Sequence, residues 1–201
     1  MRRAMVLSLN HDPLGEMGRT HAGGQSKYVL EVAKHLALRG WGSVIYTIGG
    51  QGLPAEVQIS NGCLLVRLER ACGRRYDYDV SPEEACRLGE AALTDAVERE
   101  VEISLIYACF WLSGLAARAP ATFLHVPVIF TFCQLGTFKA QWDPYEEVAE
   151  RIAHERSVCE MAHAVVATNR DEIASITDDY GVPRHKVHFI PRGIDLQAFF
   201  P

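Results

Sequence analysis

Short apolar runs alternate with longer amphipathic segments along the whole chain. The first run, Ala4–Leu9, is continuous, which is typical of a parallel strand covered on both faces. Similar runs predict further strands at residues 44–47, 63–67, 103–107, 128–132, 164–167 and 187–190. The alternation of these strands with helical segments indicates an α/β protein, with a single doubly wound, mostly parallel, Rossmann-like sheet over residues 1–201.

The helical segments carry an apolar stripe and recognisable ends. Between Thr20 and Gly40, apolar residues recur four positions apart, and the glycine follows a basic last turn. A second helix is predicted to begin at Ser81 and to run to about Glu100. The serine as N-cap, a proline in the first turn and a glutamate three residues after the cap form a strong start signal. Further helices are predicted at residues 112–118, 145–162 and 168–179.

The composition narrows the class of protein. The chain is 48% hydrophobic with a net charge of -5, which gives no electrostatic reason to expect a nucleic-acid partner. Its six scattered cysteines contain no Cys-x-x-Cys pair, which argues against zinc and a disulfide scaffold and favours a cytoplasmic protein with reduced thiols. The uncharged stretch 119–138 is interrupted by Pro120 and Pro127, so we predict a buried strand with loops and no integral membrane segment.

Gly23 and Gly24 stand directly before the first predicted helix. Two glycines let the backbone approach a ligand closely, and the free N–H groups of a helical first turn favour an anion. A tight turn without a ligand explains the pair equally well. His21 precedes the glycines and is the histidine that we expect to touch a ligand. The pair lacks the Gly-x-Gly-x-x-Gly spacing of a dinucleotide-binding loop, which disfavours a dehydrogenase.

Two cysteines follow predicted strands, at the edge where such a sheet binds its ligand. Cys109 comes after the strand that ends at Tyr107, and Cys133 after the strand that ends at Phe132. Buried free cysteines often act as small hydrophobic residues, and the alternative is a polar or reactive group in the crevice. Lys139 is the one nearby residue expected to lower a thiol pKa, so neither cysteine is predicted to be a nucleophile.

Arg151 and Glu155 lie one helical turn apart at the edge of an apolar stripe. Ion pairs at this spacing are commonly solvated surface pairs. The neighbours of the glutamate on its own face, Ile152 and Cys159, instead favour a partly buried carboxylate that needs a partner. Both interpretations stay open at this point.

Six segments in order along the chain resemble the N-terminal domain of retaining GT-B glycosyltransferases of family 4, which includes sucrose-phosphate synthase and the mycothiol-pathway glycosyltransferase. The matching segments are Ala22–Gln25, Phe110–Gly114, Thr131–Gly136 with Lys139, Arg151–Glu155, Ala167–Thr168 with Asp171–Glu172, and Pro191–Asp195 with Phe200–Pro201. None of these segments is specific by itself, and their order carries the resemblance.

The resemblance implies two Rossmann-like domains with the active site between them, an acceptor on the N-terminal domain and a nucleotide-diphosphate sugar mostly on the other. It implies no cofactor and no metal. Arg151 would help to hold an acceptor, particularly a phosphorylated one. The expected substrate- and donor-binding residues are His21, Gly23, Gly24, Gln25, Cys109, Trp111, Cys133, Gln134, Lys139, Arg151 and Glu155.

The sequence departs from the family pattern in two respects. Cys133 stands where the family usually has a histidine that contacts the transferred sugar, and Cys109 stands where the family often has another histidine, so no catalytic residue is assigned. The second domain would begin where this sequence stops, at Pro201. We therefore expect the acceptor-side domain of a retaining hexosyltransferase, inactive in isolation. The alternative is a non-catalytic sugar- or sugar-phosphate-binding module that works with a separate partner chain.

Overall fold

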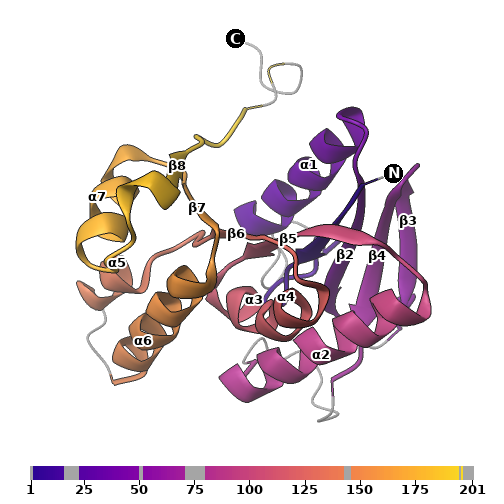
Figure 1. Ribbon diagram of the computed structural model, residues 1–201, viewed down its shortest axis with the longest axis horizontal. Coiled ribbons are helices and arrows are strands. Elements are labelled where there is room, and N and C mark those ends of the chain that lie inside the picture. Colours follow the sequence, from indigo (N-terminus) through magenta and orange to yellow (C-terminus); the bar gives the residue numbers. More distant parts are fainter. Residues whose placement is uncertain are drawn as a thin grey trace.

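The structure is a computed structural model in which residues 2–15, 23–49, 52–70, 80–142, 146–194 and 196 are described. The described strands form one eight-stranded sheet in the order β3-β4-β2-β1-β5-β6-β7-β8 (Figure 1). Their bounds are β1 Arg3–Leu7, β2 Gly42–Ile48, β3 Glu56–Ser60, β4 Cys63–Leu68, β5 Ile103–Cys109, β6 Val128–Thr131, β7 Ala164–Ala167 and β8 Val187–Phe189. The helices are α1 Gly24–Leu38, α2 Pro82–Glu98, α3 Trp111–Ala116, α4 Arg118–Leu124, α5 Gly136–Ala140, α6 Glu146–Met161, α7 Arg170–Asp178 and the 3-10 turn η1 Arg184–Lys186. The prediction of a mostly parallel, Rossmann-like sheet is confirmed.

The strand order explains why helices cover both faces of the sheet. The chain moves from β1 to β2 in one direction, and from β5 through β8 in the other. Right-handed crossovers in opposite directions put their helices on opposite faces. Accordingly α1 packs on one face, whereas α2, α3, α6 and α7 contribute to the core on the other face.

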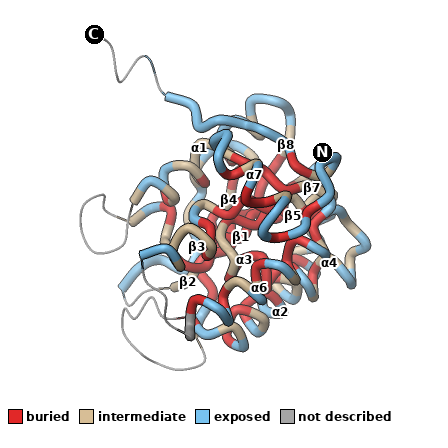
Figure 2. Tube along the Cα trace, turned by 90° about the vertical axis from the view of Figure 1, so that its left-hand side faces the viewer, coloured by how far each residue is buried: buried red, intermediate tan, exposed pale blue. Residues whose placement is uncertain are grey.

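The side chains of β1 point alternately into the two hydrophobic cores, one on each face of the sheet. Ala4 and Val6 pack with Val29 of α1, whereas Met5 and Leu7 join the larger core on the opposite face. All four β1 residues are completely buried. Figure 2 shows the same arrangement, with buried residues along the strands and exposed residues on the outer sides of the helices. The apolar first run is thus a central strand, as predicted.

Two of the predicted helices have a side-chain cap at their start. The Ser81 side chain accepts a hydrogen bond from the backbone N–H of Glu84, with Pro82 in the first turn of α2. The Asn169 side chain accepts from the backbone N–H of Glu172 at the start of α7. These side chains satisfy N–H groups that have no partner within the helix.

Three elements differ from the prediction. Strand β3 was missed, and it pairs antiparallel with β4 at the edge of the sheet. Its alternating Glu56-Val57-Gln58-Ile59-Ser60 pattern matches an edge strand with one half-buried side. The short helices α4 and α5 were expected to be loops or the end of an earlier helix.

Helix α4 forms although it contains Pro120. The proline lies in the first helical turn, where a backbone N–H has no intrahelical acceptor, so the missing donor costs little. The uncharged stretch 119–138 is consequently divided among α4, β6 and α5. Among the described helices, none combines the length and the apolar character that crossing a bilayer requires.

Candidate functional site

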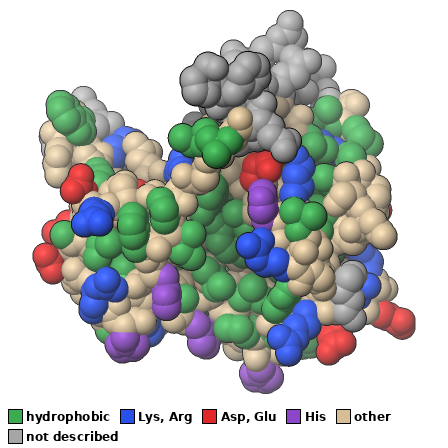
Figure 3. Space-filling model, turned by 90° about the horizontal axis from the view of Figure 1, so that it is seen from above, with side chains coloured by type: hydrophobic (Ala, Val, Ile, Leu, Met, Phe, Trp, Pro, Cys, Tyr) green, Lys and Arg blue, Asp and Glu red, His purple; other side chains and the backbone are tan. Residues whose placement is uncertain are grey.

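The sheet has a topological switch point between β1 and β5. From this point β2 and β4 follow on one side and β6, β7 and β8 on the other. Leu7 of β1 lies beside Ala108 of β5. Open α/β sheets bind ligands beyond the carboxyl ends of their strands at such a point. Seen from above, the molecular surface is hollowed between the side that carries α5 to α7 and the side that carries α1 (Figure 3). Hydrophobic side chains line this hollow.

The first turn of α1 faces the switch point without a side-chain cap. Gly23 is the N-cap, and the first turn contains no acidic residue. Among the described residues, a Cβ added at Gly23 would meet no atom within 4 Å, and one at Gly24 would approach only Nη1 of Arg192, at 4.0 Å. Packing of the described chain does not require either glycine. Their absence of side chains leaves the N–H groups of this turn open to a ligand.

Gln25 ties α1 to the strand ends. Its side chain forms a reciprocal amide pair with Asn10, in which Nδ2 donates to Oε1 at 3.0 Å and Nε2 donates to Oδ1 at 2.6 Å. Nε2 also lies 3.5 Å from the carbonyl oxygen of Cys109. The amide of Gln25 is therefore occupied by the protein itself, and it positions the glycine turn over the crevice.

Cys109 and Cys133 lie against each other in the crevice. Their Sγ atoms are 2.7 Å apart. Cys109 has no exposed surface, and burial raises the pKa of its thiol, an effect to which the neighbouring thiol adds. Cys133 is half-buried and has a positive φ of 65°. A buried thiol with a raised pKa is a poor nucleophile toward reagents in solution.

Arg192 was not predicted as a site residue, yet it reaches back over the glycine turn. Its Nη2 lies 3.4 Å from the carbonyl oxygen of Cys133, and its guanidinium carbon lies 5.3 Å from the ring centre of Tyr28. The positive charge that acts on Cys109 comes from Arg192, whereas the sequence had suggested Lys139. The available signal was the position of Arg192, just after the carboxyl end of the last strand.

Glu155 is completely buried, so the interpretation of a solvated surface pair is wrong. Its carboxylate accepts from the backbone N–H of Gly136 at 3.0 Å, from Tyr180 Oη at 2.5 Å and from Arg151 Nε at 2.8 Å. Burial raises the pKa of the Glu155 carboxyl, and its hydrogen-bond partners oppose this shift. Glu155 supports the loop after β6 from the interior of the protein, and it has no exposed surface with which to contact a ligand.

Arg151 is almost as deeply buried and also supports this loop. Its Nη2 donates to the carbonyl oxygen of Gln134 at 2.5 Å, and its guanidinium carbon lies 5.0 Å from the Phe110 ring centre. The Trp111 ring stacks on His154 of α6, with ring centres 5.7 Å apart and planes 15° apart. The segment after β5 and the segment after β6 are thus both anchored to α6.

The predicted site residues therefore fall into groups. Gly23, Gly24, Gln25, Cys109 and Cys133 meet at the switch point, and exposed Gln134 follows the second cysteine. Arg151 and Glu155 are buried supports of the loop after β6, and Trp111 stacks on His154 of the same helix. Lys139 lies in the last turn of α5. His21 lies outside the described residues.

The described residues contain no group of three or more histidine, cysteine, aspartate or glutamate side chains able to hold a metal ion. That the reaction needs neither a metal nor a cofactor stays a prediction.

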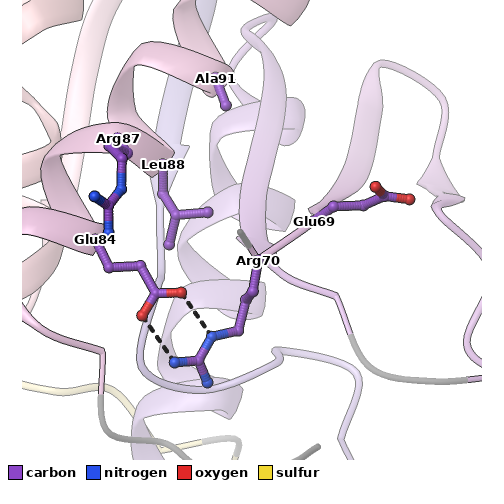
Figure 4. Close-up of a pocket in the computed structure, with 6 residues that line it drawn as sticks. All are labelled: Glu69, Arg70, Glu84, Arg87, Leu88 and Ala91. Atoms are coloured by element: carbon purple, nitrogen blue, oxygen red, sulfur yellow. Dashed lines mark hydrogen bonds and ion pairs between the residues drawn. The ribbon is translucent and has the colours of Figure 1, made fainter. Parts of the chain in front are cut away.

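A pocket of about 340 Å³ lies away from the switch point, where α2 begins beside the end of β4 (Figure 4). Two of its lining residues, Arg70 and Glu84, form a bidentate ion pair, with both N···O distances 2.8 Å. Other lining residues are Glu69, Arg87, Leu88 and Ala91. The Arg70–Glu84 pair holds the end of β4 on α2, which is a structural role.

Comparison with known proteins identifies the family. The sequence matches the family described as Glycosyltransferase Family 4 over residues 22–198. It is 30% identical, over 206 residues, to a D-inositol 3-phosphate glycosyltransferase of Geodermatophilus obscurus, a match that covers 100% of this chain and 46% of the relative. Mannosylfructose-phosphate synthase of Agrobacterium fabrum is 30% identical over 208 residues, with 95% of this chain and 44% of the relative covered.

A solved structure extends this relationship to the fold. Sucrose-phosphate synthase of Thermosynechococcus elongatus superposes with a TM-score of 0.86 and 26% identity, over 100% of this chain and 50% of that one. The chain spans about half the length of these relatives. Its sheet is the N-terminal, Rossmann-like part of a GT-B fold. On sequence and on fold, the chain belongs to glycosyltransferase family 4.

Proposed function

We propose that this chain is the acceptor-side domain of a retaining hexosyltransferase that uses a nucleotide-diphosphate sugar as donor. One observation carries the proposal. At the switch point, the uncapped first turn of α1 opens through Gly23 and Gly24 toward the same crevice as Cys133 and exposed Arg192. A helix N-terminus beside a guanidinium suits the diphosphate of such a donor.

In this proposal the domain contributes positioning and electrostatic stabilisation. The N–H groups at Gly24 and the guanidinium of Arg192 face the negative charge that grows on the leaving diphosphate. The buried Arg151–Glu155 pair fixes Gln134 and Gly136, so the loop after β6 holds its shape beside the reacting sugar. The described residues form one wall of a site, and we propose that turnover requires a second Rossmann-like domain.

A phosphorylated acceptor is the finer part of the proposal. The names of the relatives supply the support, since inositol 3-phosphate, mannosylfructose phosphate and sucrose phosphate each carry a phosphate. The resemblance implies an acceptor on this domain and a role for Arg151 in holding it. Because Arg151 Nε and Nη2 are bonded within the protein, its proposed role is to position the acceptor loop around Gln134.

The Gly24→Ala variant tests the anion site. Alanine suits a first helical turn and meets only Arg192 at 4.0 Å, so the free energy of unfolding should stay equal or rise slightly. If a diphosphate approaches this backbone, the added methyl group should weaken pyrophosphate binding about tenfold or more. Pyrophosphate titration followed by NMR should shift the backbone amides of residues 24 and 25 in the parent chain. Shifts confined to the basic turn Arg184–Lys186 would contradict the site.

Transfer is tested by adding a second Rossmann-like domain. The chain is fused to the C-terminal half of the Geodermatophilus obscurus relative and assayed with nucleotide-diphosphate hexoses and with phosphorylated and unphosphorylated acceptors. We expect transfer by the fusion only, with the anomeric configuration of the donor kept in the product. Equal transfer by the 201-residue chain alone would contradict the proposed need for a second domain.

One observation favours a non-catalytic alternative. The thiols of Cys109 and Cys133 face each other, and a thiol cannot reproduce the hydrogen bonds of an imidazole. A sugar-phosphate-binding module would show saturable binding without turnover in a folded fusion. Restoring an imidazole through Cys133→His separates the two functions, because it should raise transfer only in an enzyme.

A further inference from the structure

Cys109 and Cys133 form a geometrically matched thiol pair at the ends of two neighbouring strands. Cys109 ends β5 and is in register with Thr131, which ends the adjacent parallel strand β6. Two residues later the chain turns at Cys133, whose positive φ of 65° belongs to this turn. The resulting Sγ–Sγ distance is 2.7 Å, against about 2.05 Å in a disulfide bond. Bond formation therefore needs only a small movement of two side chains that already face each other.

The two thiols differ in access. Cys133 has exposed surface at the crevice, whereas Cys109 has none. A reagent in solution therefore reaches Cys133 first, and Cys109 lies behind it within bonding reach. Arg192 lies beside this pair, with its Nη2 3.4 Å from the carbonyl oxygen of Cys133.

The other described cysteines lack this arrangement. Cys63 and Cys159 are buried, and half-buried Cys86 lies on α2. Within the described part of the chain, the Cys109–Cys133 contact is the one sulfur–sulfur contact. Cys72 lies outside the described residues.

We propose that Cys109 and Cys133 are a redox-modification site, which a small-molecule disulfide converts to a reversible intramolecular disulfide. In the first step the Cys133 thiol loses its proton to solvent and its sulfur attacks one sulfur of the reagent RSSR. The S–S bond of the reagent breaks, RS⁻ leaves and takes up a proton, and Cys133 carries a mixed disulfide.

In the second step the sulfur of Cys109 attacks Sγ of Cys133, and the thiol proton of Cys109 passes to the departing thiolate. The mixed disulfide breaks and releases the second RS⁻, which takes up that proton and leaves as RSH. The protein loses two electrons and two protons overall, and one RSSR becomes two RSH. The raised pKa of Cys109 makes this second step slow when the thiol is buried, whereas its closeness to Cys133 favours it.

Peptide mapping tests this site, because trypsin separates the two cysteines. Cleavage after Arg99, Arg118 and Lys139 puts Cys109 alone in peptide 100–118 and Cys133 alone in peptide 119–139. The native 201-residue chain is incubated with excess oxidised glutathione, free thiols are blocked with N-ethylmaleimide, and the digest is analysed by mass spectrometry. We expect peptides 100–118 and 119–139 joined by a disulfide as the main product, and separated again by dithiothreitol.

Matched variants sharpen the result. Cys109→Ser should stop the reaction at a glutathione adduct on peptide 119–139, because the second thiol is missing. Cys86→Ser should leave the yield of the joined peptides unchanged. In denaturant the yield should fall several-fold, as the folded geometry no longer selects this pair. The inference is overturned if native Cys133 keeps glutathione, if both peptides carry only maleimide, or if denaturation leaves the yield unchanged.

Discussion

The carboxylate of Glu155 accepts a hydrogen bond from the backbone N–H of Gly136, with Oε2 and N 3.0 Å apart. Tyr180 donates to the same oxygen, and Arg151 donates to the other one. A carboxylate with no exposed surface is thereby compensated on both oxygens. Because Arg151 also holds the carbonyl group of Gln134, the loop after β6 rests on a buried charge network.

Gly136→Ala should destabilise the fold. A Cβ at this position would lie 2.6 Å from Oε2 of Glu155 and 2.9 Å from Cγ1 of Ile152. Overpacking of this kind costs about 1–3 kcal/mol, measured as a loss in the free energy of unfolding in urea. Gly193→Ala is the matched control, because an added Cβ there meets no described atom within 4 Å. Equal free energies of unfolding for the two variants would show that the loop moves to accommodate the added methyl group without loss of stability.

Glu155→Ala should lower the free energy of unfolding far more than Glu150→Ala, a change on the same helix. Removing one partner of a buried ion pair costs about 3–5 kcal/mol, because the other charge stays buried without compensation. Glu150, on the same helix, has a side chain that is 68% exposed, so Glu150→Ala should change the free energy of unfolding by about 0.5 kcal/mol or less. Urea unfolding of both variants gives the comparison, and similar losses would contradict the structural role of Glu155.

The carboxyl group of Glu155 should also contribute to the pH dependence of stability. Burial raises the pKa of Glu155 in the folded chain, so the folded chain binds a proton at pH values where the unfolded chain has released it. This contribution to stability is fully present below the ordinary carboxyl pKa and is lost as the pH rises through the raised folded value.

Glu155→Gln cannot titrate at this position, and every other group is kept. From about pH 4 to about pH 7, the free energy of unfolding of the parent chain should therefore fall relative to that of Glu155→Gln. Urea unfolding at several pH values measures this difference. A difference that stays constant, or that rises with pH, would mean that the carboxyl pKa is not raised.

The reciprocal amide pair between Asn10 and Gln25 should be measurable as a coupling. Each alanine variant should lose about 1 kcal/mol of unfolding free energy, because the remaining amide loses both hydrogen bonds of the pair. The double variant should lose less than the sum, with a coupling energy of about 0.5 kcal/mol or more. Strictly additive losses would show that the pair does not hold the glycine turn to the strand end.

The elements that were predicted well have local causes. Successive side chains of an apolar run such as Ala4–Leu9 point to opposite faces of the sheet, and both faces are buried. The caps at Ser81 and Asn169 accept hydrogen bonds from N–H groups three residues away. Strand β3 carried the alternating pattern of an edge strand and could have been found. Helix α4 was harder to predict, since proline in a first turn is compatible with either a helix or a loop.

Local sequence patterns were enough to predict the fold class, the glycine turn before α1 and the cysteines after two strands, because period, caps and strand ends depend on neighbours in the chain. What these residues contact is set by the tertiary fold. It buried Glu155 beneath Gly136, set the sulfur of Cys109 against that of Cys133, and brought Arg192 beside Gly24 across 168 residues. Such contacts depend on strand order and crossover direction, which join distant segments and leave no periodic signal in the sequence.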